Sequence, residues 1–186
     1  MSLNLLLQSR KTVFRVSDIG KILNITNNNY LLVHVNRLKK RGVIAMIKKG
    51  IYALSNGYDE FELANKIKIP SYVSLQTMLF KHGIIFQDFS DTITSVSNNT
   101  VSLKIKGKNY FYHKIKNAIL TNPTGVVTEN QVRMAIPERA IADTIYLFKD
   151  FYFDNIENID KKLLLSIGKN YNQQVFYKIK KICSIK

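Results

Sequence analysis

A helix that ends in glycine and runs directly into a β-hairpin is the pattern that most limits how this chain can fold. Apolar residues recur at helical spacing from residue 28 onward, and Gly42 closes the pattern because glycine readily takes the left-handed conformation at a helix end. Two short β-rich runs follow, joined by Lys48-Lys49-Gly50. We therefore predict a helix over 28–41 and two strands over 43–47 and 51–54.

The residues before this helix predict three further elements. An apolar stretch at 1–8 is typical of an amphipathic helix, and residues 12–16 are typical of a short strand. Ser17 or Asp18 then offers a cap for a helix that ends near Leu23, before a turn. The resulting order is helix, strand, helix, turn, helix and hairpin, which resembles a winged helix-turn-helix.

Positive charge is concentrated in the same segment. The chain has 28 Lys and Arg against 13 Asp and Glu, a formal net charge of +15, and residues 1–56 hold ten of these bases but a single acid, Asp18. A soluble basic protein most often binds nucleic acid, with an anionic membrane surface as the next partner and a merely solvated charge as the plain alternative. Acidic and turn residues first gather at 55–60. We expect a DNA-binding domain over 1–56 and a second domain over 57–186.

The predicted helix directs polar side chains away from its apolar face, taken at about 100° per residue from Leu31. Asn can read adenine edges in the major groove, Arg can read guanine, and Lys suits phosphate. Val33 is a misfit on this face, although it suits a thymine methyl group. A solvated basic face is the usual alternative. The candidate DNA-binding residues are Asn28, Asn29, Tyr30, Asn36, Arg37, Lys40 and Arg41 on the helix, and Lys48 and Lys49 at the hairpin tip.

The rest of the chain predicts an α+β domain with a small antiparallel sheet and C-terminal helices. Ser71 or Ser74 offers a cap for a helix over 75–82, and Pro137 begins another helix, where its missing N–H costs nothing. Further helices are expected near 61–67, 159–168 and 171–183, and strands near 92–96, 101–105, 110–115, 125–128 and 131–135.

Lysines alternate along the hairpin predicted in this domain, at positions that include Lys104, Lys106 and Lys108. They form either a solvated edge or a second surface for phosphate. The neighbouring rings of Tyr110, Phe111 and Tyr112 suit stacking on single-stranded bases, but the alternation of a strand buries at least one of them.

Other kinds of site have little support. The three histidines form no ligand pair, and no glycine-rich phosphate loop occurs. Glu138 and Asp143 lie about 140° apart on one helix, so Arg139 is a more natural partner than a metal. The single cysteine, Cys183, fits a reducing cytoplasm, and no apolar run approaches the roughly 18 residues of a membrane span. We expect a cytoplasmic protein without catalytic residues, metal, cofactor or membrane contact.

Two segments and the hairpin resemble the AbiEi-type antitoxins. The segments are 69–79 followed by His82-Gly83, and 135–147, whose helix start Pro137-Glu138-Arg139-Ala140 is the most distinctive part. In the hairpin, Lys49-Gly50-Ile51-Tyr52 stands where that family has a basic residue, glycine, an apolar residue and tyrosine. The resemblance covers roughly residues 10–150, and Thr77 and Met78 stand where the family often has small residues.

The resemblance implies a transcriptional regulator that is the antitoxin and autorepressor of a type IV toxin–antitoxin, or abortive-infection, system. Such a protein would bind inverted repeats in double-stranded promoter DNA, as a monomer or weak dimer with two copies on the DNA. Its toxin would be a nucleotidyltransferase with which it forms no stable complex. The alternatives are a lone regulator without a toxin, an RNA-binding module, or an enzyme, either a metal-dependent nuclease or a kinase-like modifier of a toxin.

Overall fold

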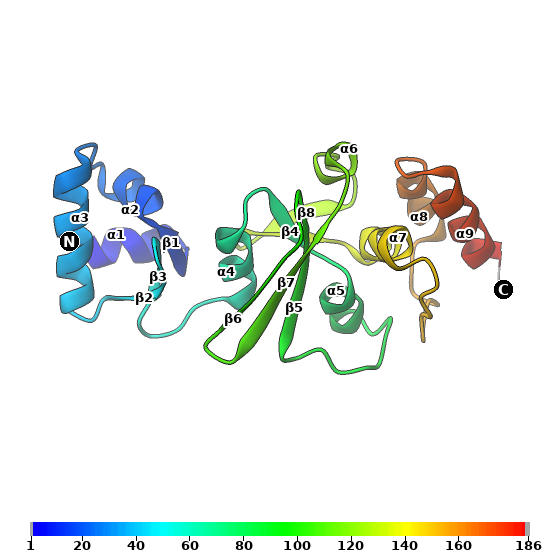
Figure 1. Cartoon of the computed structure of the whole chain (residues 1–186), viewed down its shortest axis with the longest axis horizontal. Coiled ribbons are helices and arrows are strands. Elements are labelled where there is room, and N and C mark those ends of the chain that lie inside the picture. The colour runs from blue at the N-terminus through cyan, green and yellow to red at the C-terminus, as the bar shows by residue number, and fades with distance from the viewer. Residues whose placement is uncertain (1, 185–186) are drawn as a thin grey trace. The chain divides into compact units, whose positions relative to one another are not determined.

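The computed structural model describes residues 2–184, which form two compact units (Figure 1). The first unit runs to Ile69 and takes in Asn130–Val132, and the second comprises Pro70–Glu129 and the residues from Arg133 onward. The composition changes at 55–60, before helix α4 (Glu60–Ile67), whereas the packing divides the chain after that helix.

The first unit contains the elements that the sequence predicts for residues 1–56, each within one or two residues of the expected bounds. Met1 lies outside the described residues. The elements are α1 (Ser2–Gln8), β1 (Val13–Arg15), α2 (Val16–Leu23), α3 (Asn28–Lys40), β2 (Ile44–Lys48) and β3 (Ile51–Leu54).

One apolar core joins these helices to a small sheet. The three strands pair antiparallel in the order β1-β3-β2, so that Tyr52 of β3 lies between Phe14 and Met46. Helices α1, α2 and α3 cover this sheet with side chains that are almost fully buried, because the apolar positions of each helix repeat at a spacing of three or four residues. The core consists of Leu6, Phe14, Ile19, Leu31, Val35, Leu38, Ile44, Tyr52 and Leu54.

The prediction that Ser17 or Asp18 caps α2 from the position before the helix was wrong. Neither Ser17 nor Asp18 precedes the helix, because α2 begins at Val16 with Arg15 as the capping residue. Asp18 instead lies one turn inside, where its Oδ2 accepts a hydrogen bond from the backbone N–H of Arg15 at 2.9 Å. The carboxylate thus satisfies an N–H at the helix start by reaching back from the third helical position.

Within the first unit, polar contacts hold α4 against the start of β1 and against α2. Glu62 Oε2 accepts hydrogen bonds from the N–H of Thr12 at 2.7 Å, the hydroxyl of Thr12 at 2.8 Å and the N–H of Val13 at 3.2 Å. Lys66 Nζ lies 2.7 Å from Asp18 Oδ2, and the Arg15 guanidinium donates to the carbonyl of Lys66. These contacts explain why α4 packs with residues that precede it by about 50 positions in the sequence.

The second unit is α+β, as predicted, but its sheet is larger than expected and mixed. Six strands lie in the order β6-β7-β5-β4-β9-β8, and two of the pairs, β5 with β7 and β4 with β9, are parallel. The expectation of a small antiparallel sheet was therefore wrong, because alternation identifies strands but not their neighbours. The strands are β4 (Ser71–Val73), β5 (Thr92–Ser97), β6 (Val101–Ile105), β7 (Lys108–Lys114), β8 (Val126–Glu129) and β9 (Val132–Ala135).

Helices accompany this sheet, and α7, α8 and α9 pack against one another at one end of the unit (Figure 1). Pro137 begins α7 as predicted. The proposed serine caps of α5 were wrong, because Ser71 lies in β4 and the Ser74 hydroxyl donates to Asp143 at 2.8 Å. The helices are α5 (Gln76–Lys81), α6 (Asn117–Leu120), α7 (Pro137–Phe148), α8 (Lys161–Gly168) and α9 (Gln173–Ser184).

Candidate nucleic-acid interface

Helix α3 is fixed at both ends and along one face. Its first turn is capped by Asn27, whose side-chain oxygen accepts the N–H of Tyr30 at 3.0 Å. The helix ends before Gly42, which has a φ of 68°, and the N–H of Val43 then returns to the carbonyl of Leu38 at 3.0 Å. Its apolar face is buried in the core of the first unit. The opposite face is held in a defined orientation as a result.

All candidate DNA-binding residues of α3 are exposed. Asn29, Asn36 and Lys40 follow one line along the helix, with Val33 among them, 47% exposed. Tyr30, 55% exposed, begins the neighbouring line, which continues through Arg37 to Arg41. The fold therefore brings amide, guanidinium and ammonium groups together on the outer surface of one helix.

The side chains of these candidate residues make no hydrogen bond or ion pair with any residue between 2 and 184. The ring centroid of Tyr30 lies 6.2 Å from that of His34, and Nε2 of His34 lies 3.1 Å from the hydroxyl of Ser2 in α1. Because α3 carries no acidic residue, its own side chains do not neutralise the cations. These donors remain available to an external ligand.

The hairpin β2–β3 supplies the remaining candidates. Lys48 ends β2 and Lys49 lies in the turn, and both side chains are exposed. Gly50 completes this turn with a φ of 79°, a backbone conformation that residues other than glycine rarely adopt. The pairing register shifts between Met46 and Lys48, which bends the strand next to the tip.

The structure adds exposed cations that the helical projection did not select. Lys39 is exposed on the flank of α3. The projection from Leu31 would have selected it if the outward face had been taken as wider. Lys21 of α2 borders a hollow of about 400 Å³ whose wall also includes Ser17, Asn24 and Asn28. The charge of Lys21 was visible in the sequence, but its position beside the start of α3 depends on how the two helices pack.

Two acidic residues of the first unit, Asp18 and Glu62, have shifted pKa values. Burial would raise the pKa of Asp18, but its hydrogen bonds from Lys66 and Arg15 outweigh it and hold the pKa below the ordinary value. For Glu62, burial outweighs the hydrogen bonds from Thr12 and Val13 and raises the pKa. The carboxylate of Asp18 caps α2 and pairs with Lys66 of α4. The carboxylate of Glu62 holds α4 against the start of β1.

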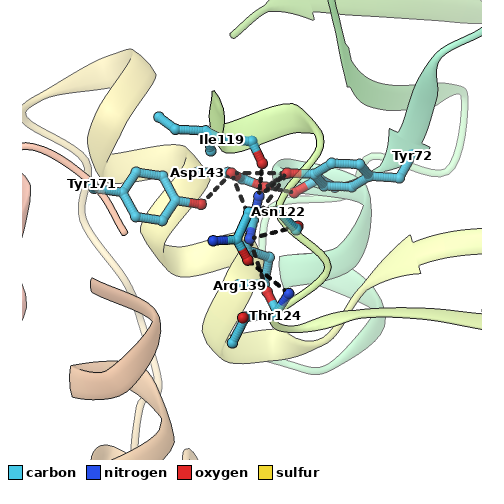
Figure 2. A network of polar contacts seen from close by, with 8 residues as sticks. Tyr72, Ile119, Asn122, Thr124, Arg139, Asp143 and Tyr171 are labelled. Atoms are coloured by element: carbon cyan, nitrogen blue, oxygen red, sulfur yellow. Dashed lines mark hydrogen bonds and ion pairs between the residues drawn. The ribbon is translucent and has the colours of Figure 1, made fainter. Parts of the chain in front are cut away.

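The second unit contains a buried polar network centred on Arg139 (Figure 2). All five N–H groups of its guanidinium have acceptors: the hydroxyl of Tyr72, at 3.1 Å from Nε and 2.8 Å from Nη2, and three backbone carbonyls. The carbonyls are those of Ile119, Thr124 and Asn122, at 2.7, 2.8 and 3.5 Å. The predicted ion pair is confirmed, with Nε 3.4 Å from Asp143 Oδ1.

Asp143 completes this network from the next turn of α7. It accepts hydrogen bonds from the hydroxyls of Tyr171 at 2.6 Å, Ser74 at 2.8 Å and Tyr72 at 3.0 Å. Burial raises the pKa of both tyrosines well above the ordinary value, and the charge of Asp143 raises it further, so the phenols stay protonated as donors. With its donors and acceptors matched, the network connects β4, α7 and Tyr171 within the second unit.

Two other acidic residues of the second unit are also engaged in hydrogen bonds. Glu138 Oε1 accepts the N–H of Asp160 at 2.8 Å, and Asp160 in turn caps α8 through the N–H of Leu163 at 3.0 Å. Among residues 2–184, no three His, Cys, Asp or Glu side chains gather in a way that would hold a metal ion.

The lysine-bearing hairpin β6–β7 has one exposed and one buried set of side chains. Tyr110 and Tyr112 are almost fully buried, which confirms that the strand buries some of its aromatic residues, while Phe111 is 41% exposed. Lys104 is exposed on the edge strand β6, and Lys108 donates to the carbonyl of Ser90 at 2.6 Å. A role of this hairpin in binding phosphate stays a prediction.

Comparison with known proteins finds a similarity for most of the first unit. Residues 1–55 match the family AbiEi_4, described as "Transcriptional regulator, AbiEi antitoxin". The match covers the elements from α1 to β3, including the exposed face of α3 and the basic hairpin. A search of curated proteins finds no match. No helix within residues 2–184 has the length and apolar character needed to cross a membrane.

The resemblance deduced from the sequence is thus confirmed for residues 1–55. The segments 69–79 and 135–147 lie beyond the match, so the resemblance there stays a prediction.

Proposed function

We propose that this protein is a sequence-specific transcriptional regulator whose first unit binds double-stranded promoter DNA as a winged helix-turn-helix. The observation that carries the proposal is the outer face of α3, where exposed amide and cationic side chains have no partner within residues 2–184. The match of residues 1–55 to a family of antitoxin regulators supports it. The order α2, turn, α3 and hairpin β2–β3 supports the winged form.

In this proposal α3 enters the major groove. Asn29 and Asn36 would pair with adenine edges and Arg37 with guanine, because these side chains match the paired donors and acceptors of those bases. Lys40 and Arg41, at the end of the helix, would contact phosphate and set the register. Lys48 and Lys49 would hold the flanking backbone from the hairpin tip.

We further propose that the protein is the antitoxin and autorepressor of a type IV toxin–antitoxin system in the cytoplasm. Two copies would bind inverted repeats in its promoter, as expected when a two-fold symmetric site is read by a monomer or weak dimer. Residues 57–186 would supply the antitoxin function towards a nucleotidyltransferase toxin, without a stable complex and without a cofactor. The family description "Transcriptional regulator, AbiEi antitoxin" supports this role.

Fluorescence anisotropy with the DNA upstream of the gene tests the DNA-binding proposal. Arg37→Ala should remove the preference for this DNA over a scrambled duplex, while Lys49→Ala should weaken both duplexes alike and lower the slope of log K against log salt by about 0.9. Lys169→Ala, an exposed lysine of the second unit, is the matched control. If neither Arg37→Ala nor Lys49→Ala changes binding, the proposed interface is wrong.

A separate experiment tests the antitoxin role. A nucleotidyltransferase reading frame beside the gene should arrest growth when expressed alone, and co-expression of this protein should restore growth. Size-exclusion chromatography of the two purified proteins should show no complex. If the neighbouring genes include no toxin, or if co-expression leaves growth arrested, the protein is better described as a lone regulator.

A further inference from the structure

The C-terminal part of the second unit contains a groove that the proposed function does not use. It lies between the end of α7, the segment 149–153 and α9, and its volume is about 460 Å³. A smaller hollow of about 230 Å³ adjoins it and shares Ile145, Lys149 and Lys178 as lining residues. We call these two hollows together the α7–α9 groove.

Contacts within the unit hold the wall of this groove in place. Lys149 follows the last residue of α7 with a φ of 41°. The ammonium group of Lys178 donates to the carbonyl of Lys149 and to Asp150 Oδ1, the latter at 3.0 Å. The rings of Phe148, Phe151 and Phe153 follow one another at centroid distances of 6.4 and 5.2 Å. The segment is therefore a packed wall of the groove.

Two tyrosine rings remain on the surface of this groove. Tyr152 is 80% exposed, although it lies between the half-buried Phe151 and Phe153. Tyr177 of α9 is 59% exposed and lines the smaller hollow. The ammonium group of Lys181 lies 4.8 Å from the centroid of the Tyr177 ring. Exposed rings of this kind present flat faces on which another π-system can stack.

The charge of the groove is positive. Three lysines, Lys149, Lys178 and Lys181, line the larger hollow with a single acid, Asp150. Since Asp150 is paired with Lys178, the charges of Lys149 and Lys181 have no counter-charge in the lining. An occupant should therefore combine negative charge with flat aromatic groups. Single-stranded nucleic acid has both, whereas a duplex keeps its base faces stacked inside.

We propose that the α7–α9 groove binds single-stranded nucleic acid, with bases stacked on Tyr152 and Tyr177 and phosphates beside Lys149 and Lys181. This activity is distinct from the reading of duplex promoter DNA by the first unit. It also gives a role to Lys181 of α9, which the DNA-binding proposal leaves without one.

The experiment uses the full chain and 12-nucleotide labelled oligonucleotides, one of uridine RNA and one of thymidine DNA, in fluorescence anisotropy at low and high salt. An Arg37→Ala and Lys40→Ala background lowers any contribution of α3 to oligonucleotide binding, and it is the parent with which the groove variants are compared. In that background Tyr152→Ala and Tyr177→Ala should each weaken binding roughly 5- to 150-fold, because stacking on one ring contributes that much. Tyr152→Phe should bind like the parent, since the ring remains.

Matched controls separate the groove from other surfaces. Phe86→Ala removes an exposed ring and Lys169→Ala removes an exposed lysine, both from parts of the second unit outside the groove, so neither should weaken oligonucleotide binding. Lys149→Ala combined with Lys181→Ala should weaken it and reduce its salt dependence. Circular dichroism and thermal melting should show that each variant remains folded.

The outcomes are distinct. Tighter binding of RNA than of DNA, or the reverse, identifies the preferred strand, and either supports the groove. The proposal is overturned if the parent binds neither oligonucleotide, if the tyrosine variants bind like the parent, or if vesicles with anionic lipid bind the protein while the oligonucleotides do not. Loss of promoter selectivity in Arg37→Ala with unchanged oligonucleotide binding would separate this site from the proposed promoter interface.

Discussion

At the scale of single residues, the guanidinium of Arg139 connects segments of the second unit that lie far apart in the sequence. It bonds to Tyr72 of β4 and to the carbonyls of Ile119, Asn122 and Thr124, and its guanidinium carbon lies 5.4 Å from the ring centroids of both Tyr72 and Tyr171. Burial disfavours its charge, but the Asp143 carboxylate together with Tyr171 and Tyr72 outweighs this and raises the pKa of Arg139.

Replacing Arg139 should therefore destabilise the second unit strongly. Arg139→Met leaves Asp143 buried without its ion-pair partner, and we expect a loss of about 3–5 kcal/mol in the free energy of unfolding, measured by urea denaturation. Tyr171→Phe removes one hydrogen bond to the same carboxylate and should cost only about 1–3 kcal/mol. Equal losses in the two variants would show that the ion pair is not the dominant contact.

Glu62 makes the stability of the first unit dependent on pH. Burial raises the pKa of this carboxyl in the folded state above its ordinary value of 4.5, so the folded chain binds its proton more tightly than the unfolded chain does. Its contribution to stability is complete below pH 4.5 and is lost as the pH rises through the folded pKa. Glu62→Gln keeps an acceptor for Thr12 without this titration.

Urea denaturation of both proteins between pH 4 and pH 7 measures this effect. Wild type should lose stability relative to Glu62→Gln as the pH rises through that range. A difference between the two proteins that stays constant with pH would mean that Glu62 titrates alike in the folded and unfolded chains.

At the scale of elements, the orientation of α3 depends on how closely α2 approaches it. A Cβ atom added to Gly20 would lie 2.9 Å from Leu31 Cδ2 and 3.1 Å from the carbonyl oxygen of Ile25. Gly20→Ala should therefore push α3 away from α2, lower the stability by about 1–3 kcal/mol and weaken promoter binding.

Gly42→Ala provides the comparison for this substitution. A Cβ atom there meets no atom within 4 Å, and its φ of 68° makes the cost purely conformational, about 1–2 kcal/mol. Thermal melting and anisotropy at a temperature where both variants are folded should show weaker DNA binding for Gly20→Ala than for Gly42→Ala. The reverse order would contradict the proposed dependence on α2–α3 packing.

Local sequence patterns predicted most helices and strands, but they did not predict which strands pair with one another in the sheet. Gly42 and Pro137 marked helix ends correctly because their backbone preferences act on the residues next to them. β4 was missed because its three residues, Ser71–Val73, are too short to show alternation, and the parallel pairing of β5 with β7 depends on contacts between distant residues. The cap of α2 was misplaced because Asp18 acts backwards, from inside the helix.

At the scale of the whole molecule, the division after Ile69 predicts which fragment can fold. A fragment of residues 1–69 retains α4, whose Glu62 accepts hydrogen bonds from Thr12 and Val13. A fragment of residues 1–56 lacks these contacts and leaves the N–H groups of β1 without this acceptor. We expect the longer fragment to melt cooperatively at a higher temperature by circular dichroism. Identical melting of the two fragments would show that α4 adds nothing to the unit.

The candidate interface was predictable to the extent that exposure follows helical periodicity. The projection from Leu31 placed Asn29, Asn36 and Arg37 on the outer face, and the structure exposes all three. Their lack of partners could not be predicted, because it depends on where every other polar side chain lies. The α7–α9 groove could not be predicted either, since Tyr152 and Tyr177 are 25 residues apart in sequence and line two hollows whose walls depend on the packing of α7 against α9.

The separation between the buried and the outer faces of α3 has an evolutionary consequence. The residues proposed to read DNA lie outside the core cluster, so selection can exchange most of them at a cost of less than about 0.5 kcal/mol in folding free energy. A duplicated copy of the gene would thus be free to acquire a new operator while it retained its scaffold. The same freedom makes α3 a suitable position for designing repressors with chosen targets.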